Sequence, residues 1–225
     1  LAVEGEGTGR YFERHNGLQL GAARNLGGGR RLLLSGRYEN VRVANLPPQF
    51  LSPDIPRLDS ALLVGTGQLI LDRRNSILYP TAGTYASGTA DAGWVTRGSE
   101  GGSGPLIKPR AEWRSYIPLD RVRARSLNER ERQRTRVLAY RLMAGTTFGD
   151  LPFFEQYFVG GVDSLRGYRE DRYWGSNMLV GNAELRWPLG GSIVGAGFVD
   201  AGYAWGSDYQ FTDAPGFSTD FRQSR

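Results

Sequence analysis

Residues 193–205, IVGAGFVDAGYAW, alternate between two kinds of side chain. The odd positions, from Ile193 to Trp205, carry no charged group, whereas Asp200 occupies an even position. Successive side chains of a β-strand point to opposite faces of the sheet. The alternation therefore predicts a strand with one charge-free face and one charged face.

Three more segments repeat this pattern. In residues 178–188 the charge-free positions are odd, while Glu184 and Arg186 are even. Residues 107–117 are charged at even positions, and residues 138–148 are charge-free at even positions. A soluble β-sandwich alternates in the same way, so alternation by itself does not identify the fold class.

Length and composition favour a membrane-spanning sheet. These segments run about eleven residues, whereas strands in soluble proteins usually have about five or six, and a strand that crosses a bilayer needs about nine to eleven. The charge-free faces are rich in Gly and Ala, which suit contact with lipid better than a packed core. Aromatic residues near the strand ends suit an interfacial girdle: Trp94, Trp187, Tyr203 and Trp205. Pro109 is discordant, since a proline within a strand removes a ladder hydrogen bond.

Four weaker strand candidates precede these: 11–24, 30–43, 60–73 and 83–94. The connections between the eight candidates alternate between shorter and longer, as in outer-membrane barrels. By this parity, the long loop at 149–175 lies on the outer side. The charged stretch 119–136 lies on the periplasmic side, where we interpret it as a solvated connection that is too long for an ordinary turn.

Composition narrows the function classes. The 225 residues carry a net charge of +5, but the basic residues form no stripe with interleaved aromatics, so we expect no nucleic-acid partner. No cysteine is present, and the single histidine, His15, has no cluster of ligands beside it, so we predict no disulfide and no metal site. No apolar run reaches about eighteen residues, and no signal peptide opens the chain, which we expect to be part of a longer protein.

The loop carries an unusual order of residues. Within VGGVDSLRGYRED (159–171), a Gly-Gly pair is followed by Arg166 between Leu165 and Gly167, and then by Tyr168. A solvent-exposed connection needs no such order.

Four motifs together resemble one family. LDRRNSILYPTAGTY (71–85), GDLPFFEQYFVGGVDSLRGY (149–168), GNAELRWPL (181–189) and GFVDAGYAW (197–205) occur in its order. The chain resembles the barrel of the outer-membrane protein assembly superfamily, the BamA/TamA-like or bacterial surface antigen proteins, to which two-partner secretion transporters are related. Leu165 stands where that family usually has Val. The resemblance implies an all-β, transmembrane antiparallel β-barrel. Residues 1–225 would form one part of it, about eight of about sixteen strands, with the periplasmic domains and closing strands outside this chain.

In that family, the long loop folds back into the barrel and its arginine contacts acidic residues on the inner wall. The alternation places Glu184 and Asp200 on inward faces of consecutive strands, as neighbours across one ladder. We therefore predict that Arg166 bridges both carboxylates, for which its planar fork is suited. Gly160, Gly161 and Gly167 would allow the backbone geometry, and we expect Tyr168 to pack on the wall. The remaining inward charges are interpreted as ordinary ladder pairs.

The resemblance implies an assembly or insertion factor for outer-membrane proteins, which performs no covalent chemistry and uses no cofactor. Its partners would be membrane lipids, unfolded or secreted outer-membrane polypeptides, and periplasmic accessory proteins. Its place would be the outer membrane of a Gram-negative-type bacterium or of an organelle derived from one. Two alternatives stay open: a two-partner secretion pore, and the barrel of a lipase-type autotransporter. No G-x-S-x-G nucleophile elbow is present, so we predict no catalytic residue.

Overall fold

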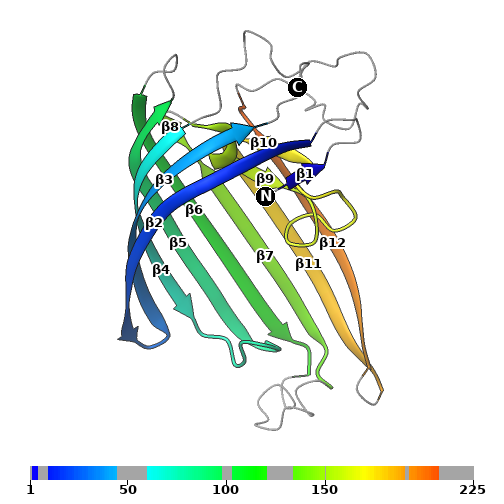
Figure 1. Cartoon of the computed structure of the whole chain (residues 1–225). Coiled ribbons are helices and arrows are strands. Elements are labelled where there is room, and N and C mark those ends of the chain that lie inside the picture. The colour runs from blue at the N-terminus through cyan, green and yellow to red at the C-terminus, as the bar shows by residue number, and fades with distance from the viewer. Residues whose placement is uncertain are drawn as a thin grey trace, which may run out of the picture.

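One curved antiparallel sheet dominates the molecule (Figure 1). The computed structural model of the protein describes residues 2–4, 10–44, 60–97, 103–120, 134–149, 151–190 and 193–207. Eight long strands follow one another in the sheet: β2 (Arg10–Gly27), β3 (Arg30–Ala44), β4 (Ser60–Asp72), β5 (Gly83–Arg97), β6 (Ser103–Pro118), β7 (Val137–Thr146), β11 (Asn177–Gly190) and β12 (Ile193–Trp205). Two short strands join them, β1 (Ala2–Glu4) beside β2 and β8 (Phe148–Gly149) beside β6.

The predicted fold class is confirmed. Each of the eight predicted segments overlaps one long strand, and the bounds differ by a few residues at the ends. Sequence-adjacent strands pair antiparallel from β1 to β7, and β7 then pairs with β11 across the loop. Within the described residues, β1 and β12 end the sheet and do not pair with each other, so it forms part of a barrel.

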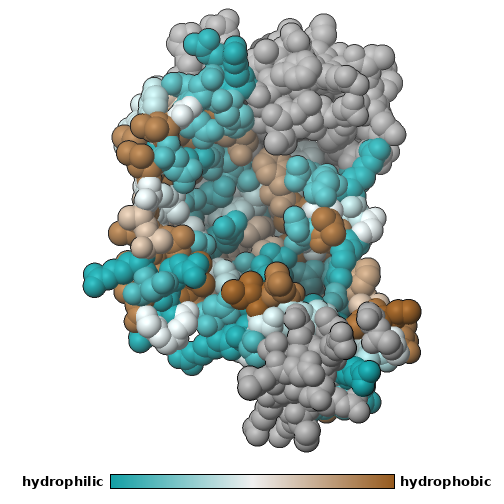
Figure 2. Space-filling view, turned by 60° about the horizontal axis from the view of Figure 1, so that its bottom comes forward, coloured by the Kyte–Doolittle hydropathy of each residue, from teal (hydrophilic) through white to brown (hydrophobic). Residues whose placement is uncertain are grey.

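The register assigns one face of every strand to the hollow. Leu179 pairs with Tyr203 and Ala183 with Val199 on the convex face, and Val199 is 72% exposed there. Figure 2 shows hydrophilic side chains in the hollow and hydrophobic ones along the outer flank. This is the arrangement expected of a sheet with lipid outside and water inside.

Near the end of the sheet where the 149–175 loop emerges, the concave face is apolar and buried. One group of five inward side chains comes from β3 to β6, and we call it the β3–β6 patch: Val41, Leu62, Val64, Val95 and Leu106. A second group combines β11 and β12 with the loop: Met178, Val180, Ala204, Tyr157, Val159 and Leu165. The loop covers both groups, since Leu151 and Phe154 pack on the first and three loop residues belong to the second. At this end of the sheet the inner face is therefore apolar, a feature for which the sequence analysis made no prediction.

Pro109 is accommodated at an interruption of the ladder. β6 pairs with β8 at Leu106 and Ile107 and with β7 only from Arg110 onward, so the paired positions on that edge skip Pro109. A missing N–H disturbs little where the ladder is already broken. Its carbonyl oxygen is used instead, because the Tyr157 hydroxyl donates to it at 2.9 Å.

Polar contacts fix the turn between β4 and β5. The amide oxygen of Asn75 accepts from the backbone N–H groups of Thr81 at 3.0 Å and Ala82 at 3.1 Å. Gly83 has φ +102°, and a Cβ there would lie 2.2 Å from the carbonyl oxygen of Arg73. The glycine of the 71–85 motif is thus required by the shape of the turn.

The described residues hold no helix long and apolar enough to cross a membrane. Of the charged stretch 119–136, residues 121–133 lie outside the described residues. At its described ends, Arg136 donates to the carboxylate of Asp120 at 2.9 and 3.1 Å, which holds the ends of β6 and β7 together.

Candidate functional site

The loop 149–175 turns back into the hollow of the sheet (Figure 1). It contains the 3₁₀ turn η2 (Phe153–Glu155) and a small antiparallel hairpin of β9 (Tyr157–Val159) and β10 (Tyr173–Gly175). Residues 160–172 form the tip between the two hairpin strands, and they carry the predicted motif.

Arg166 bridges two carboxylates on two strands. Its Nε and Nη2 donate to the two carboxylate oxygens of Asp200 on β12, both at 2.8 Å. Its Nη1 donates to Glu184 on β11 at 2.6 Å, and its backbone N–H donates to Asp200 at 3.0 Å. The planar guanidinium thus engages Asp200 with two parallel bonds and keeps a third donor for Glu184.

The two acids lie diagonally across the β11–β12 ladder. Glu184 pairs with Phe198, and Asp200 pairs with Asn182, so the carboxylates are two residues apart along the strands. Like charges at this distance repel each other. The positive guanidinium lies between them and offsets that repulsion.

An aromatic ring from the wall completes this site. The Arg166 guanidinium lies 3.6 Å from the ring centroid of Phe198, which shares the concave face with Asp200. A cation over an aromatic face adds about 0.5–2 kcal/mol. The sequence prediction had assigned the aromatic contact with the wall to Tyr168. That ring is 53% exposed and lies 6.1 Å from the ring of Tyr173 in the same loop, and its packing on the wall stays a prediction.

The three glycines of the motif adopt left-handed backbone angles. Gly160, Gly161 and Gly167 have φ of +148°, +78° and +89°. A Cβ at Gly160 would lie 2.2 Å from the carbonyl oxygen of Arg169, and one at Gly161 would lie 2.3 Å from the carboxyl group of Glu170. The first two glycines therefore allow close packing inside the tip. At Gly167 a Cβ would meet no neighbour, so only its positive φ favours glycine there.

Further contacts hold the tip, and they were not predicted. Asn182 donates from one amide nitrogen to the carbonyl oxygen of Ser164 at 2.7 Å and to Asp200 at 2.9 Å. Arg141 donates to the carbonyl oxygen of Asp163 at 2.6 Å. The alternation predicts that Asn182 and Arg141 face inward. It does not predict their contacts with the loop, because these depend on the path of the tip. Leu165 is buried in the patch that the loop shares with β11 and β12.

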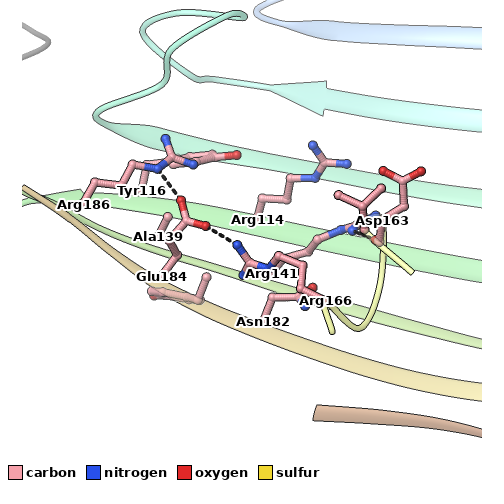
Figure 3. A pocket seen from close by; sticks show the side chains of 11 residues that line it. Arg114, Tyr116, Ala139, Arg141, Asp163, Arg166, Asn182, Glu184 and Arg186 are labelled. Atoms are coloured by element: carbon pink, nitrogen blue, oxygen red, sulfur yellow. Dashed lines mark hydrogen bonds and ion pairs between the residues drawn. The ribbon is translucent and has the colours of Figure 1, made fainter. Parts of the chain in front are cut away.

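A pocket of about 280 Å³ lies between the tip and the wall (Figure 3). Its four arginines are paired: Arg114 and Arg141 share Glu112, and Arg166 and Arg186 share Glu184. The arginines at the pocket therefore belong to two sets of ion pairs, one around Glu112 and one around Glu184. Such pairing suits a water-filled interior and offers no nucleophile beside a base.

Charge neutralisation strengthens the Arg166 contact. The Asp200 side chain is 4% exposed, Glu184 19% and Arg166 26%. Hydrogen bonds to the Asp200 carboxylate raise the pKa of Arg166 above its ordinary value. Burial opposes this increase, and the hydrogen bond to Glu184 adds to it. The group is cationic at every physiological pH, so the bridge does not switch with pH. Removing one member of such a pair leaves a poorly solvated charge and costs several kcal/mol.

His15 lies in β2, where its Nδ1 contacts the carboxylate of Glu39 at 2.6 Å. Its ring meets Phe154 of the loop edge to face, with centroids 5.9 Å apart. Across the described ranges, no group of three or more His, Cys, Asp or Glu side chains is placed to hold a metal ion.

A family model described as the Omp85 superfamily domain matches residues 10–225. Two curated relatives are similar in sequence. The outer membrane protein assembly factor BamA of Nitratidesulfovibrio vulgaris is 32% identical over 159 residues, which is 62% of this chain and 18% of that protein. The chloroplastic outer envelope protein 39 of Arabidopsis thaliana is 37% identical over 67 residues, which is 29% of this chain and 18% of that protein.

One solved structure extends the likeness to the fold. The crystal structure of BamA from Haemophilus ducreyi lacking POTRA domains 1-3 matches with a TM-score of 0.69 at 17% identity. The match covers 91% of this chain and 45% of that one. The chain thus spans less than half the length of the proteins named here.

Proposed function

Because the chain belongs to the Omp85 superfamily, we propose that it forms part of the barrel of a factor that assembles or inserts β-barrel proteins. The barrel lies in the outer membrane of a Gram-negative-type bacterium or of an organelle derived from one, in keeping with its family and its relatives. We propose that it acts without covalent chemistry and without a cofactor. Its partners are membrane lipids and unfolded outer-membrane polypeptides, with periplasmic accessory proteins where the complete protein binds them.

The proposed mechanism uses backbone pairing. A barrel that can part between its first and last strands offers unpaired N–H and C=O groups, and an incoming strand can add to such an edge. We expect those seam strands outside this chain. The eight strands described here would act as the rigid wall, and the 149–175 loop as an internal element held against that wall.

The observation that carries this proposal is the Arg166 anchor, which we define as Arg166 with Asp200 and Glu184. A loop that only limited the width of a passive pore would need no bidentate charge pair joined to the backbone of its tip. The anchor fixes the tip against two adjacent strands at once. That supports a role in which the loop keeps the wall in one shape while another part of the barrel opens.

The test is Arg166→Ala in the complete protein. Reconstituted in lipid vesicles, the variant should reduce the rate at which an unfolded β-barrel client becomes folded by about tenfold or more, as expected for the loss of a partly buried pair. Arg31→Ala is the matched control, because the Arg31 side chain is exposed and donates to Asn25 on the neighbouring strand β2. It should leave the rate within about twofold.

Two results would count against the proposal. Equal client folding by the parent and by Arg166→Ala, with both barrels intact, would remove the role of the anchor in assembly. Release of a soluble polypeptide across the vesicle membrane, without insertion of any client, would instead identify a secretion pore.

A further inference from the structure

A second charged contact holds the opposite half of the loop. Glu155, at the end of η2, is 6% exposed. Its carboxylate accepts from the guanidinium of Arg37 on β3 and from the ammonium of Lys108 on β6, the latter at 3.3 Å. Lys108 also donates to the backbone carbonyl oxygen of Glu155 at 2.5 Å. Buried charges are normally paired, and these two cations are the partners of the Glu155 carboxylate.

These two cations lie on strands that are not neighbours. β4 and β5 separate β3 from β6 in the sheet, so one loop carboxylate joins two places on the curved wall. Arg37 also pairs with Glu39 on its own strand at 2.8 Å. The Glu155 contact is therefore connected to the charge ladder of the wall, as the Arg166 anchor is.

Apolar packing accompanies the charges. Leu151 and Phe154 of the loop pack on the β3–β6 patch, whose five side chains are buried. The Lys108 ammonium lies 4.8 Å from the ring centroid of Tyr157, and the Tyr157 hydroxyl donates to the carbonyl oxygen of Pro109. The near half of the loop, residues 151–158, thus contacts β3 to β6 through Leu151, Phe154 and Glu155. Its last part, at Tyr157, also packs with β11 and β12, on which the tip rests.

We propose that Glu155 is a second positioning residue of the loop, and that the loop is a strut held at both ends across the hollow. The Glu155 anchor, defined as Glu155 with Arg37 and Lys108, fixes the near half to one wall. The Arg166 anchor fixes the tip to the other. This inference rests on the proposed function for its biological consequence. The strut holds β3 and β6 at a set distance from β11 and β12 while a client is inserted elsewhere in the barrel.

The sequence of the loop allows the two halves to be tested separately. The near half contains Phe153, Phe154, Tyr157 and Phe158 but no Lys or Arg, so chymotrypsin cleaves it and trypsin does not. The tip contains Arg166, Arg169 and Arg172 for trypsin. Cleavage of the purified complete protein in detergent, with fragments assigned by mass, reports the opening of each half.

Glu155→Gln keeps the shape of the side chain and removes its charge. Chymotryptic cleavage within 151–158 should become about tenfold faster or more, because cleavage follows the population of the open form. Tryptic cleavage at Arg169 and Arg172 should stay within about twofold of the parent. Arg37→Gln should reproduce this pattern, and adding it to Glu155→Gln should change little further. Glu170→Gln, which removes an exposed acid of the same loop, is the matched control for the near half, and its chymotryptic cleavage within 151–158 should match that of the parent.

The outcomes separate this inference from the proposed function. Parent-like chymotryptic cleavage of Glu155→Gln, in a barrel that still migrates as folded on unheated gels, would overturn the second anchor. Opening of both halves at once would also overturn it, because the loop would then be a single unit held at Arg166. An opened near half with unchanged client folding would keep the anchor and remove its proposed part in assembly.

Discussion

The two anchors of the loop use opposite arrangements of charge. At the tip, a loop cation meets two wall acids on adjacent strands. In the near half, a loop acid meets two wall cations on strands separated by two others. Both are also held through the backbone, the tip by its N–H group at Arg166 and the near half by its carbonyl oxygen at Glu155.

This difference assigns the anchors different tasks. A bidentate guanidinium depends on direction, because its parallel donors accept a carboxylate in one plane. It sets the orientation of the tip. The carboxylate of Glu155, with donors from two sides and apolar side chains beside it, depends on exclusion of water more than on direction. It sets where the near half lies.

Loss of both anchors should have the largest effect. Arg166→Ala with Glu155→Gln should free the whole loop, so that chymotrypsin and trypsin both cleave it at least about a hundredfold faster than in the parent. The sites lie on opposite walls and share no side chain, so the two effects should add in free energy. The measurement is the pair of cleavage rates for both single variants and the double variant. Strong non-additivity would show that the loop is one cooperative unit.

Within the Arg166 anchor, the two acids should differ. Asp200 accepts three hydrogen bonds from Arg166, and Glu184 accepts one. Asp200→Asn should therefore lower the free energy of opening the tip by about 3 kcal/mol, and Glu184→Gln should lower it by about 1 kcal/mol, on the scale of hydrogen bonds to charged groups. Tryptic cleavage at Arg169 and Arg172 measures both. If Glu184→Gln had the larger effect, Glu184 would be the main partner of Arg166. Chymotryptic cleavage within the near half should not change in either variant.

A smaller effect is expected from Arg166→Lys. The ammonium keeps the charge but loses the planar fork and much of the contact with Phe198. The free energy of opening the tip should therefore fall by about 1–2 kcal/mol. Trypsin still recognises residue 166, and cleavage at that site can be compared with the parent. If the lysine variant matched the parent, charge alone would account for the anchor. If it matched the alanine variant, geometry would account for it.

Much of this molecule could be predicted from its sequence, and the two anchors show where prediction ends. Alternation identified the strands and placed Glu184 and Asp200 inward, because a period of two is a local property of the chain. The same alternation placed Lys108 inward. It could not pair Lys108 with Glu155, since the position of a loop residue across a hollow depends on curvature and on the path of the loop.

The missed features share that cause. The β3–β6 patch lies on inward faces, and only a loop folded over it explains why it is apolar. Phe198 was likewise an even, inward residue without an assigned role, and it became part of the site through its contact with Arg166. An apolar run on an inward face of a barrel strand is the signal that could have predicted a covering loop.

Tyr157→Phe should weaken the near half alone. Its hydroxyl donates to Pro109 and lies 3.3 Å from the carbonyl oxygen of Thr146. Without the hydroxyl, those carbonyls lose a donor, which costs about 0.5–1.5 kcal/mol. Chymotryptic cleavage within 151–158 should rise by about two- to tenfold, with tryptic cleavage of the tip unchanged. A parallel rise in tip cleavage would show that Tyr157 supports the hairpin as a whole.

Alkaline pH should give the finest separation of the two halves. Burial raises the pKa of Tyr157 from 10.0 to about 12. The neutral phenol is therefore favoured by the folded loop, and its contribution is complete below about pH 10 and is lost as pH rises through about 12. The tip should not respond in this window, because its hydrogen bonds to Asp200 raise the pKa of Arg166 above that of an ordinary arginine. The measurement is the tyrosinate absorbance of the parent minus that of Tyr157→Phe, and the difference should titrate near pH 12. A midpoint near 10 would mean that the Tyr157 hydroxyl is open to water, and the near half would then be held by the Glu155 charges and the β3–β6 patch without it.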